Sequence, residues 1–205
     1  VWDRDSPLRQ VPHFTAATIQ RCQARGIHDV YALADVLPDM SQHERDELLQ
    51  LNKRQLADVA TLTNDFPYVD IEFDILDKEK LDSASTIILQ AKLECDVDEE
   101  EEEPSDPTAI APFYPSPKMT GWWLVIGDPG TNSLLSIKRV TIAKTLDVRL
   151  EFMLPAGMHD KLKLYLMCDS YIGADRELEV PALHVAQGEE DEELDDEDNI
   201  EMPDA

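Results

Sequence analysis

Apolar residues recur at helical spacing at the start of the chain. Ile19 and Cys22 lie three residues apart on one side of a predicted helix, and Ile27 follows them. Thr15 precedes this run as a predicted N-cap residue, and Gly26 stands where a helix favours a left-handed C′ residue. The pattern therefore predicts a helix between Thr15 and Gly26.

Three more helical segments follow before Pro67. The second has apolar residues on one face and ends at Pro38, and the third opens with the S-x-x-E capping box of Ser41 and Glu44. The predicted apolar face of the second segment contains Val30, Leu33, Ala34 and Leu37, and the apolar residues of the fourth segment are Leu56, Val59, Ala60 and Leu62. We expect a small helical domain over residues 1–67, a marginal bundle that needs a neighbour to cover its free face.

After Pro67 the spacing of apolar residues changes from the helical period to alternation. In "YVDIEFDIL" the apolar residues alternate with acids, and in "STIILQAKLEC" Ile87, Leu89, Ala91 and Leu93 share one face. Further segments follow: "WWLVIGD", "SLLSIKRVTI", "DVRLEFML", "KLKLYLMCD" and "RELEVPALHV". Together they predict an immunoglobulin- or fibronectin-type β-sandwich of about seven strands over residues 68–187, without a disulfide frame. The expected fold class is α+β.

The acidic residues are concentrated in two segments. Of 44 Asp and Glu residues, nine lie between Glu94 and Asp106 and eleven lie between Glu189 and Asp204. Runs of like charge repel and cannot pack, so we expect a disordered loop at about 95–108 and a disordered tail at 188–205. The remaining 24 acids against 18 bases argue against sequence-independent binding to phosphate backbones.

The cysteines, the lack of a membrane segment and the first residue limit the setting of the chain. Cys22, Cys95 and Cys168 are scattered without CxxC spacing, which indicates reduced thiols in a reducing compartment. No apolar run approaches 18 residues, so no membrane contact is expected. The chain begins at Val1 without a methionine, and we expect it to be the C-terminal piece of a longer protein.

The segment "GWWLVIGDPGTNSLLSIKRV" could be a phosphate-binding loop or a β-hairpin. A Walker-type loop needs a lysine after its last glycine and leads into a helix. Here the lysine is missing after Gly130, Pro129 removes a backbone donor, and "SLLSIKRV" has the pattern of a strand. The segment therefore predicts strand, turn and strand.

This hairpin contains the candidate interaction residues. Trp122 and Trp123 are consecutive, so one is expected in the core and the other on the surface, where it could contact a partner. Lys138 and Arg139 alternate in the same way on the second strand. All four are predicted as a candidate protein interface, with simple solvation as the alternative for the two basic residues.

No residue pattern predicts a catalytic or metal site. The five histidines do not stand at metal-ligand spacing from carboxylates or thiols: His13, His28, His43, His159 and His184. Asp169 and Asp175 could form a carboxylate pair, although a corner between strands with a turn at Gly173 explains the segment better. Nothing places a histidine beside a serine. We expect no enzymatic activity in this chain and no cofactor.

The first helical turn suggests a nucleic-acid alternative. Helix, "ARGI" and helix resemble a helix-hairpin-helix, whose turn amides contact a phosphate, and Arg21, Arg25 and Gly26 would make that contact. The usual hairpin has two glycines around an apolar residue, and here only Gly26 is present. A packing hairpin is the favoured interpretation, and nucleic-acid contact is expected to be weak or absent.

Six segments follow one another in an order found in a known family. They are "PHFTAATIQRC", "DELLQL", "FPYVDIEFDI", "GWWLVIGD", "NSLLSIKRV" and "LYLMCDSYIGAD". In this order they resemble the Sec-sixty-three homology units, from about Pro12 to Val180, and within that family the units of two-cassette RNA helicases of the spliceosome. Such units contain a helix-hairpin-helix-like part and a fibronectin-like sandwich.

The resemblance implies that this part of the protein is a non-catalytic scaffold. The helicase motor motifs would lie upstream, in a parent that uses ATP to unwind the U-four/U-six duplex during pre-mRNA splicing. This part would be a nuclear scaffold whose partners are splicing proteins and the rest of its own helicase chain. The endoplasmic-reticulum translocation subunit that gives the unit its name is the alternative, as a cytosolic domain of a membrane protein. A ligand-binding or enzymatic sandwich is a third possibility, and it requires a pocket with convergent polar groups.

Overall fold

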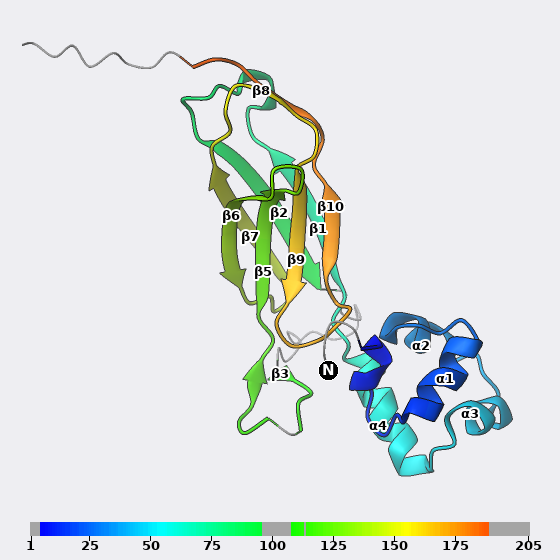
Figure 1. The fold of residues 1–205 in the computed structure, drawn as a ribbon. Coiled ribbons are helices and arrows are strands. Elements are labelled where there is room, and N and C mark those ends of the chain that lie inside the picture. The colour runs from blue at the N-terminus through cyan, green and yellow to red at the C-terminus, as the bar shows by residue number, and fades with distance from the viewer. Residues whose placement is uncertain (1–4, 96–107, 113, 189–205) are drawn as a thin grey trace, which may run out of the picture.

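The computed structural model describes residues 5–95, 108–112 and 114–188. Four α-helices and one 3₁₀ helix precede the strands (Figure 1). They are η1 (Pro7–Gln10), α1 (Ala16–Ala24), α2 (Val30–Val36), α3 (Gln42–Leu49) and α4 (Lys53–Asn64). No helix in these described ranges has the length and hydropathy needed to cross a bilayer. The predicted acidic loop and tail fall almost entirely outside the described residues.

The caps of α1 are those predicted. The Thr15 hydroxyl accepts a hydrogen bond from the Thr18 N–H at 3.2 Å. At the other end Gly26 has φ +80°, and the Ile27 N–H bonds the Cys22 carbonyl at 3.0 Å. This is a Schellman arrangement, and both Ile27 and Cys22 are buried.

The later helices differ from expectation at a few positions. The capping box of Ser41 and Glu44 is confirmed, and a second one, formed by Asn52 and Gln55 at the start of α4, was not predicted. Ala60, one of the apolar residues of α4, is exposed. The buried stripe of α4 runs instead through Val59, Leu62 and Thr63, at spacings of three and four residues.

The strands in the described ranges form four antiparallel sheets. The larger two are a three-stranded sheet in the order β1-β2-β7 and a four-stranded sheet in the order β10-β9-β5-β6. Their strands are β1 (Val69–Ile75), β2 (Ile87–Cys95), β7 (Thr145–Phe152), β10 (Arg176–Glu179), β9 (Lys163–Cys168), β5 (Trp122–Asp128) and β6 (Ser133–Val140). Two short ribbons pair β3 (Thr108–Ala109) with β4 (Lys118–Met119), and β8 (Gly157–His159) with β11 (Leu183–Val185).

Each predicted strand segment contains a strand of one of the two larger sheets. Eleven strands are present in the described ranges, and the four short strands of the two ribbons were not predicted as separate strands. The segment "RELEVPALHV" was expected to be one strand, which is wrong: it divides around Pro181 into β10 and β11, and β11 pairs with β8 instead of β9. The Val180 N–H still donates to the Leu162 carbonyl at 3.0 Å, so the change of partner falls after Val180.

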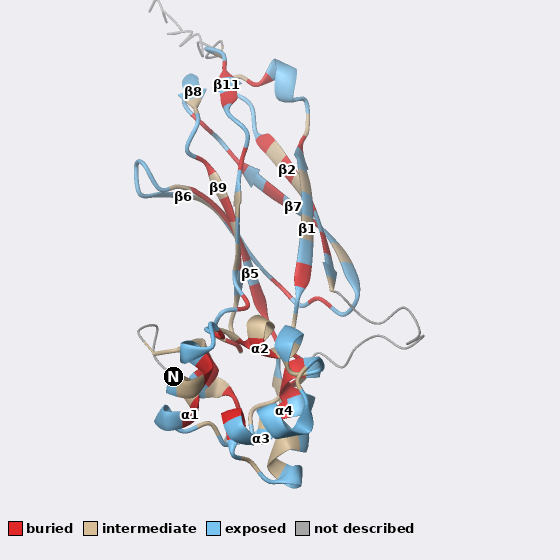
Figure 2. Ribbon diagram, turned by 90° about the vertical axis from the view of Figure 1, so that its right-hand side faces the viewer, coloured by how far each residue is buried: buried red, intermediate tan, exposed pale blue. Residues whose placement is uncertain are grey.

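The two larger sheets lie in separate layers with a shared apolar interior (Figures 1 and 2). The predicted inward residues of β2 are all buried: Ile87, Leu89, Ala91 and Leu93. From the other layer Leu124, Leu164 and Leu166 are fully buried. Alternation along each strand therefore determines which side chains fill the interior and which form the two outer faces.

Hydrogen bonds join the helical part to one end of the sheets. The Gln10 side chain donates to the Ile172 carbonyl at 2.6 Å and accepts from the Ile172 N–H at 3.0 Å. Ile172 lies in the connection between β9 and β10, in which Gly173 has φ +85°. This two-way bond links residues separated by 162 positions, so η1 and the β9–β10 loop are held together.

Aromatic rings fill the same junction. Tyr31 of α2 packs edge-to-face on Phe66 and Tyr68, with ring centroids 5.1 and 5.8 Å apart. Phe66 in turn contacts Tyr171, and the Arg176 guanidinium lies 4.6 Å from the centroid of the Tyr68 ring. These contacts bury apolar area between helices and sheets, so the two parts support each other.

Tyr31 makes the junction sensitive to alkali. Its hydroxyl donates to the Pro67 carbonyl at 2.8 Å, and burial raises the pKa of Tyr31 to about 12. The unfolded chain ionises this tyrosine near its ordinary value of about 10, while the native chain keeps the proton. The contribution of Tyr31 to the free energy of unfolding is therefore fully present below pH ~10. It is lost as pH rises towards about 12, by up to ~2 kcal/mol.

We expect the Tyr31→Phe variant to lose less unfolding free energy at alkaline pH than the wild type. Urea unfolding at pH 7, 9.5 and 11 measures the difference in free energy between wild type and variant. The difference should shrink at the highest pH, because Phe cannot ionise. A gap that stays constant from pH 7 to pH 11 would show that Tyr31 is not held neutral by the fold.

Candidate protein-interaction surface

The two larger sheets expose chemically different outer faces. On the three-stranded sheet, cross-strand neighbours on the outer face include Glu72, Lys92 and Asp147 in one row and Asp74, Gln90 and Arg149 in the next. These side chains are charged or polar. These charged and polar side chains are suited to contact with water, and they do not form an apolar surface for a partner.

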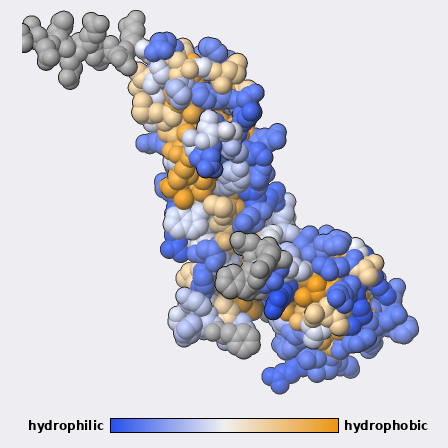
Figure 3. Space-filling model, viewed as in Figure 1, coloured by the Kyte–Doolittle hydropathy of each residue, from blue (hydrophilic) through white to orange (hydrophobic). Residues whose placement is uncertain are grey.

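The outer face of the four-stranded sheet has an apolar part over β5, β6 and the end of β9, and a charged part with Lys163, Glu177 and Glu179 towards β10. The apolar part alternates with the buried leucines and contains Trp123, Val125, Ile137, Arg139, Tyr165 and Met167. Ile137 is 49% exposed, and Trp123 and Met167 are each 37% exposed. Figure 3 shows an apolar patch over β5 and β6. A contiguous apolar patch on a sheet is typical of a protein-binding surface.

The two tryptophans divide between core and surface, as alternation predicts. Trp122 is 1% exposed, with Val140 and Cys168 as its cross-strand neighbours. Trp123 lies on the outer face, where Arg139 and Met167 are its neighbours. The structure therefore assigns the inward side chain to Trp122, which the sequence could not do.

Asp169 organises the basic side chains beside Trp123. Its carboxylate accepts hydrogen bonds from Lys118 at 2.7 Å, from the Gly121 N–H at 2.9 Å and from Arg139 at 2.8 Å. Arg139 also lies 5.5 Å from the centroid of the Trp123 ring, a cation–π distance. Asp169 thereby holds Arg139 against Trp123 at one end of the outer face.

The surroundings keep Asp169 ionised. Burial alone would raise the pKa of its carboxyl, but hydrogen bonds from Lys118, Ser170, Gly121 and Arg139 together lower it well below its ordinary value. The carboxylate lies close to the backbone at Gly121. A Cβ added at this position would stand 2.6 Å from an Asp169 oxygen, which is too close. Glycine at this position lets Asp169 reach the β5 backbone.

Lys138 and Trp122 do not share the surface with Trp123 and Arg139. Lys138 is opposite Leu124 in the register of β6 and β5, and Leu124 is fully buried. Its side chain therefore leaves β6 on the inner side, at the rim of the sheet. Of the four predicted interface residues, the structure brings together Trp123 and Arg139.

The outward residues of β9 belong to this surface and were not predicted from the sequence. Tyr165 and Met167 occupy the positions between Leu164 and Leu166, so β9 is apolar on both faces near its centre. The outward positions of an exposed strand are usually polar. Apolar residues on both faces of "LYLM" were the available signal for a covered face.

Asp169 and Asp175 do not form a carboxylate pair. Asp169 bonds the basic residues described above, whereas Asp175 accepts a hydrogen bond from the Cys168 N–H at 2.7 Å. Gly173, with φ +85°, lies in the connection between them. The strand corner proposed as the better interpretation accounts for both residues.

The arginines of the first hairpin bond within the helical part. Arg21 donates to the carbonyls of Leu48 and Leu49 at 2.7 and 3.3 Å, at the end of α3. Arg25 pairs with Glu47 at 3.2 Å. These bonds join α1 to α3, which is the geometry of a packing hairpin, and a phosphate would have to replace them.

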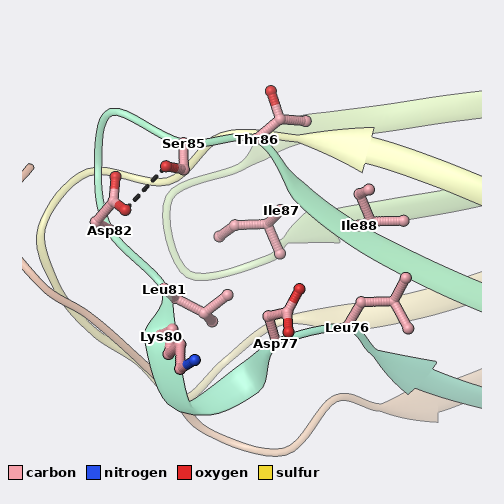
Figure 4. Close-up of a pocket in the computed structure, with 9 residues that line it drawn as sticks. All are labelled: Leu76, Asp77, Lys80, Leu81, Asp82, Ser85, Thr86, Ile87 and Ile88. Carbon is pink, nitrogen blue, oxygen red and sulfur yellow. Dashed lines mark hydrogen bonds between the residues drawn. The ribbon is translucent and has the colours of Figure 1, made fainter.

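A pocket lies elsewhere, in the connection between β1 and β2 (Figure 4). It has a volume of about 350 Å³ and contains the side chains of Asp77, Lys80, Asp82 and Ser85. Ser85 donates to Asp82 at 2.8 Å, and the Ala84 N–H bonds the same carboxylate, so Asp82 closes its own turn. Among the described residues no group of three or more His, Cys, Asp or Glu could hold a metal ion.

Fold and surface together define an α+β protein whose helical part is joined to antiparallel sheets, one with an apolar part on its outer face. The Sec63 Brl domain family matches residues 2–181. The chain therefore belongs to the Sec63 Brl domain family, as its resemblance implied.

Its relatives include U5 small nuclear ribonucleoprotein helicases and a pre-mRNA-splicing factor. The chain is 42% identical over 178 residues to the Drosophila melanogaster U5 small nuclear ribonucleoprotein 200 kDa helicase, covering 86% of this chain. It is 42% identical over 179 residues to the Schizosaccharomyces pombe pre-mRNA-splicing factor brr2, covering 87% of this chain, and 38% identical over 195 residues to the human 200 kDa helicase, covering 95%. The chain spans only 8% of the first two relatives and 9% of the third.

Proposed function

We propose that this chain is the non-catalytic C-terminal scaffold and protein-docking module of a nuclear, ATP-dependent RNA helicase of the spliceosome. The parent protein unwinds the U-four/U-six duplex, and this module binds splicing proteins and the rest of its own helicase chain. Membership of the Sec63 Brl domain family, and the U5 small nuclear ribonucleoprotein helicases and the pre-mRNA-splicing factor among its relatives, support this assignment.

The module has two folded parts in this proposal. Residues 1–67 form the helical, helix-hairpin-helix-like part, and residues 68–187 form a seven-strand sandwich of fibronectin type, followed by the tail at 188–205. The strand orders β1-β2-β7 and β10-β9-β5-β6 support a sandwich of two antiparallel sheets. The Gln10–Ile172 bonds support a rigid platform.

The contrast between the two outer faces carries the docking proposal. One is covered by charged and polar residues, and the other presents Trp123 and Ile137 beside a basic residue that Asp169 holds in place. Aromatic residues and arginine are the types enriched at the centres of protein interfaces. We therefore propose the apolar part of the outer face of the four-stranded sheet as the docking surface.

We expect the double variant Trp123→Ala, Arg139→Ala to lose its partners. The immobilised 205-residue chain, incubated with nuclear extract, should recover splicing proteins that mass spectrometry identifies, and the variant should recover about tenfold less, since loss of two interface anchors costs over ~1.4 kcal/mol. Arg149→Ala on the other sheet is the matched control and should recover the wild-type amount. Equal recovery by all three chains would contradict the proposed surface.

A further inference from the structure

β6 ends the four-stranded sheet, so one of its two sides has no neighbouring strand in the described part of the sheet. One hydrogen bond shows which residues of β5 bond β9 and which bond β6: the Asp169 N–H donates to the Gly121 carbonyl at 2.9 Å. In an antiparallel sheet the backbone groups of successive residues point to opposite sides. Gly121 and every second residue after it therefore bond β9, and Trp122, Leu124 and Ile126 bond β6.

The register then identifies the free groups of β6. Val140, Lys138 and Ser136 are opposite Trp122, Leu124 and Ile126, so their N–H and C=O groups bond β5. The N–H and C=O groups of Ile137 and Arg139 point the other way, to the open edge. The side chains of these same two residues lie on the outer face.

This edge is less protected than the others of the larger sheets. β10 is four residues long and directs Glu177 and Glu179 outward, and β1 alternates its apolar residues with three acids. The remaining edge strand, β7, is eight residues long, and its exposed residues include the charged Asp147, Arg149 and Glu151. Proteins usually blunt exposed edges with short strands or charge. β6 is eight residues long and exposes Leu134 and Ile137 at 61% and 49%.

We propose that β6 accepts an extended segment of a partner protein as a fifth strand of this sheet, and that the segment combines apolar and acidic residues. This inference rests on the proposed docking function and specifies the partner. Backbone bonds to Ile137 and Arg139 would provide the pairing, and the added strand would continue the apolar part of the outer face, which contains Trp123 and Ile137.

The charges of β6 select the partner. A residue opposite Arg139 lies on the outer face and a residue opposite Lys138 lies on the inner side, so acidic residues at both positions form cross-strand pairs. A second copy of this chain fits poorly. The register that pairs Ile137 with Arg139 of another copy sets the two Lys138 side chains opposite each other, and each copy has a net charge of −26.

Amide exchange measured by NMR on the 205-residue chain tests strand addition. The probe is an end-capped peptide of eight residues, alternating valine and threonine, with two glutamates placed opposite Lys138 and Arg139. At saturation we expect exchange of the Ile137 and Arg139 amides to slow at least about tenfold, because both become hydrogen-bonded. Fast exchange of both amides in the saturated complex would overturn the proposal. The twin peptide with lysines for glutamates should bind about tenfold more weakly, and equal binding would overturn the acidic specificity.

A proline variant tests the same edge independently of the side chains. Ile137→Pro removes a free N–H without removing a bond to β5, and it should weaken peptide binding at least about tenfold. Glu177→Pro is the matched control, because the Val180 N–H to Leu162 carbonyl bond places the Glu177 N–H on the open side of β10. If Ile137→Pro does not fold, the exchange experiment on the wild-type chain decides. Loss of splicing proteins from the Trp123 and Arg139 variant without peptide protection would preserve the docking surface and reject strand addition, whereas failure of both would reject both.

Discussion

Trp122→Ala is expected to destabilise the protein by about 3–5 kcal/mol, whereas Trp123→Ala should cost under ~1 kcal/mol in the isolated chain. Trp122 is the larger loss because it is 1% exposed and lies in the shared interior of the two layers. Its removal leaves a cavity that neighbours on two strands cannot close. Trp123 loses only partial burial, since it lies on the outer face.

Chemical unfolding of the two variants beside wild type measures this difference. The Trp123 variant is the control for tryptophan content, because each variant retains one residue of the pair. Equal losses would contradict the assignment of side chains in β5. A Trp123 variant that is stable alone but fails to bind partners would separate the docking role from the fold.

Asp169→Ala is expected to be the second most damaging change, at about 2 kcal/mol, since it removes an acceptor shared by several donors. Lys118 and Arg139 would lose their common anion, and the Gly121 N–H would lose its acceptor. Arg139 would no longer be held against Trp123. We therefore expect the variant to weaken docking as well as stability.

The effect of Asp169 should depend on pH in a defined direction. Its carboxyl has a lower pKa in the native chain than in the unfolded chain, where the value is about 3.9. The stabilisation is therefore complete above pH ~4 and is lost as pH falls further towards the native pKa. Wild type and Asp169→Asn should differ most near pH 7 and converge in strong acid.

Urea unfolding at pH 7, 4 and 2.5 tests this expectation. Asp147→Asn on the exposed face of the other sheet is the control, and its cost should stay within ~0.5 kcal/mol at each pH. A difference between wild type and Asp169→Asn that persists undiminished at pH 2.5 would show that the Asp169 charge is not the source of the stabilisation.

Sequence patterns determined the local structure of this protein. Thr15, Gly26 and the Ser41–Glu44 box predicted helix ends correctly, because caps depend on residues only a few positions apart. Alternation predicted the β2 interior and the opposite directions of Trp122 and Trp123, because side chains of a strand point to alternate faces. Proline and glycine positions also predicted the β5–β6 turn, which Asp128 closes by accepting from the Gly130 N–H.

Strand pairing was decided by the tertiary structure. Alternation of side chains along β5 shows that Trp122 and Trp123 lie on opposite faces, but not which face is inside. The packing of β5 between its partner strands β6 and β9 and against the other sheet decided that Trp122 is buried. The division of "RELEVPALHV" depended on a pairing of β11 with β8 that brings together segments about 25 residues apart. Local pattern cannot determine which edge a strand joins.

The candidate surface likewise required the fold. Asp169 lies 51 residues from Lys118 and 30 from Arg139, and only the order β9-β5-β6 brings the three together. Gln10 and Ile172 also meet across 162 residues, where η1 lies against the connection between β9 and β10. The sequence by itself determined which residues face each way along each element, because that depends on local backbone geometry. Which of those residues share a surface was decided by long-range pairing, and no local pattern contains that information.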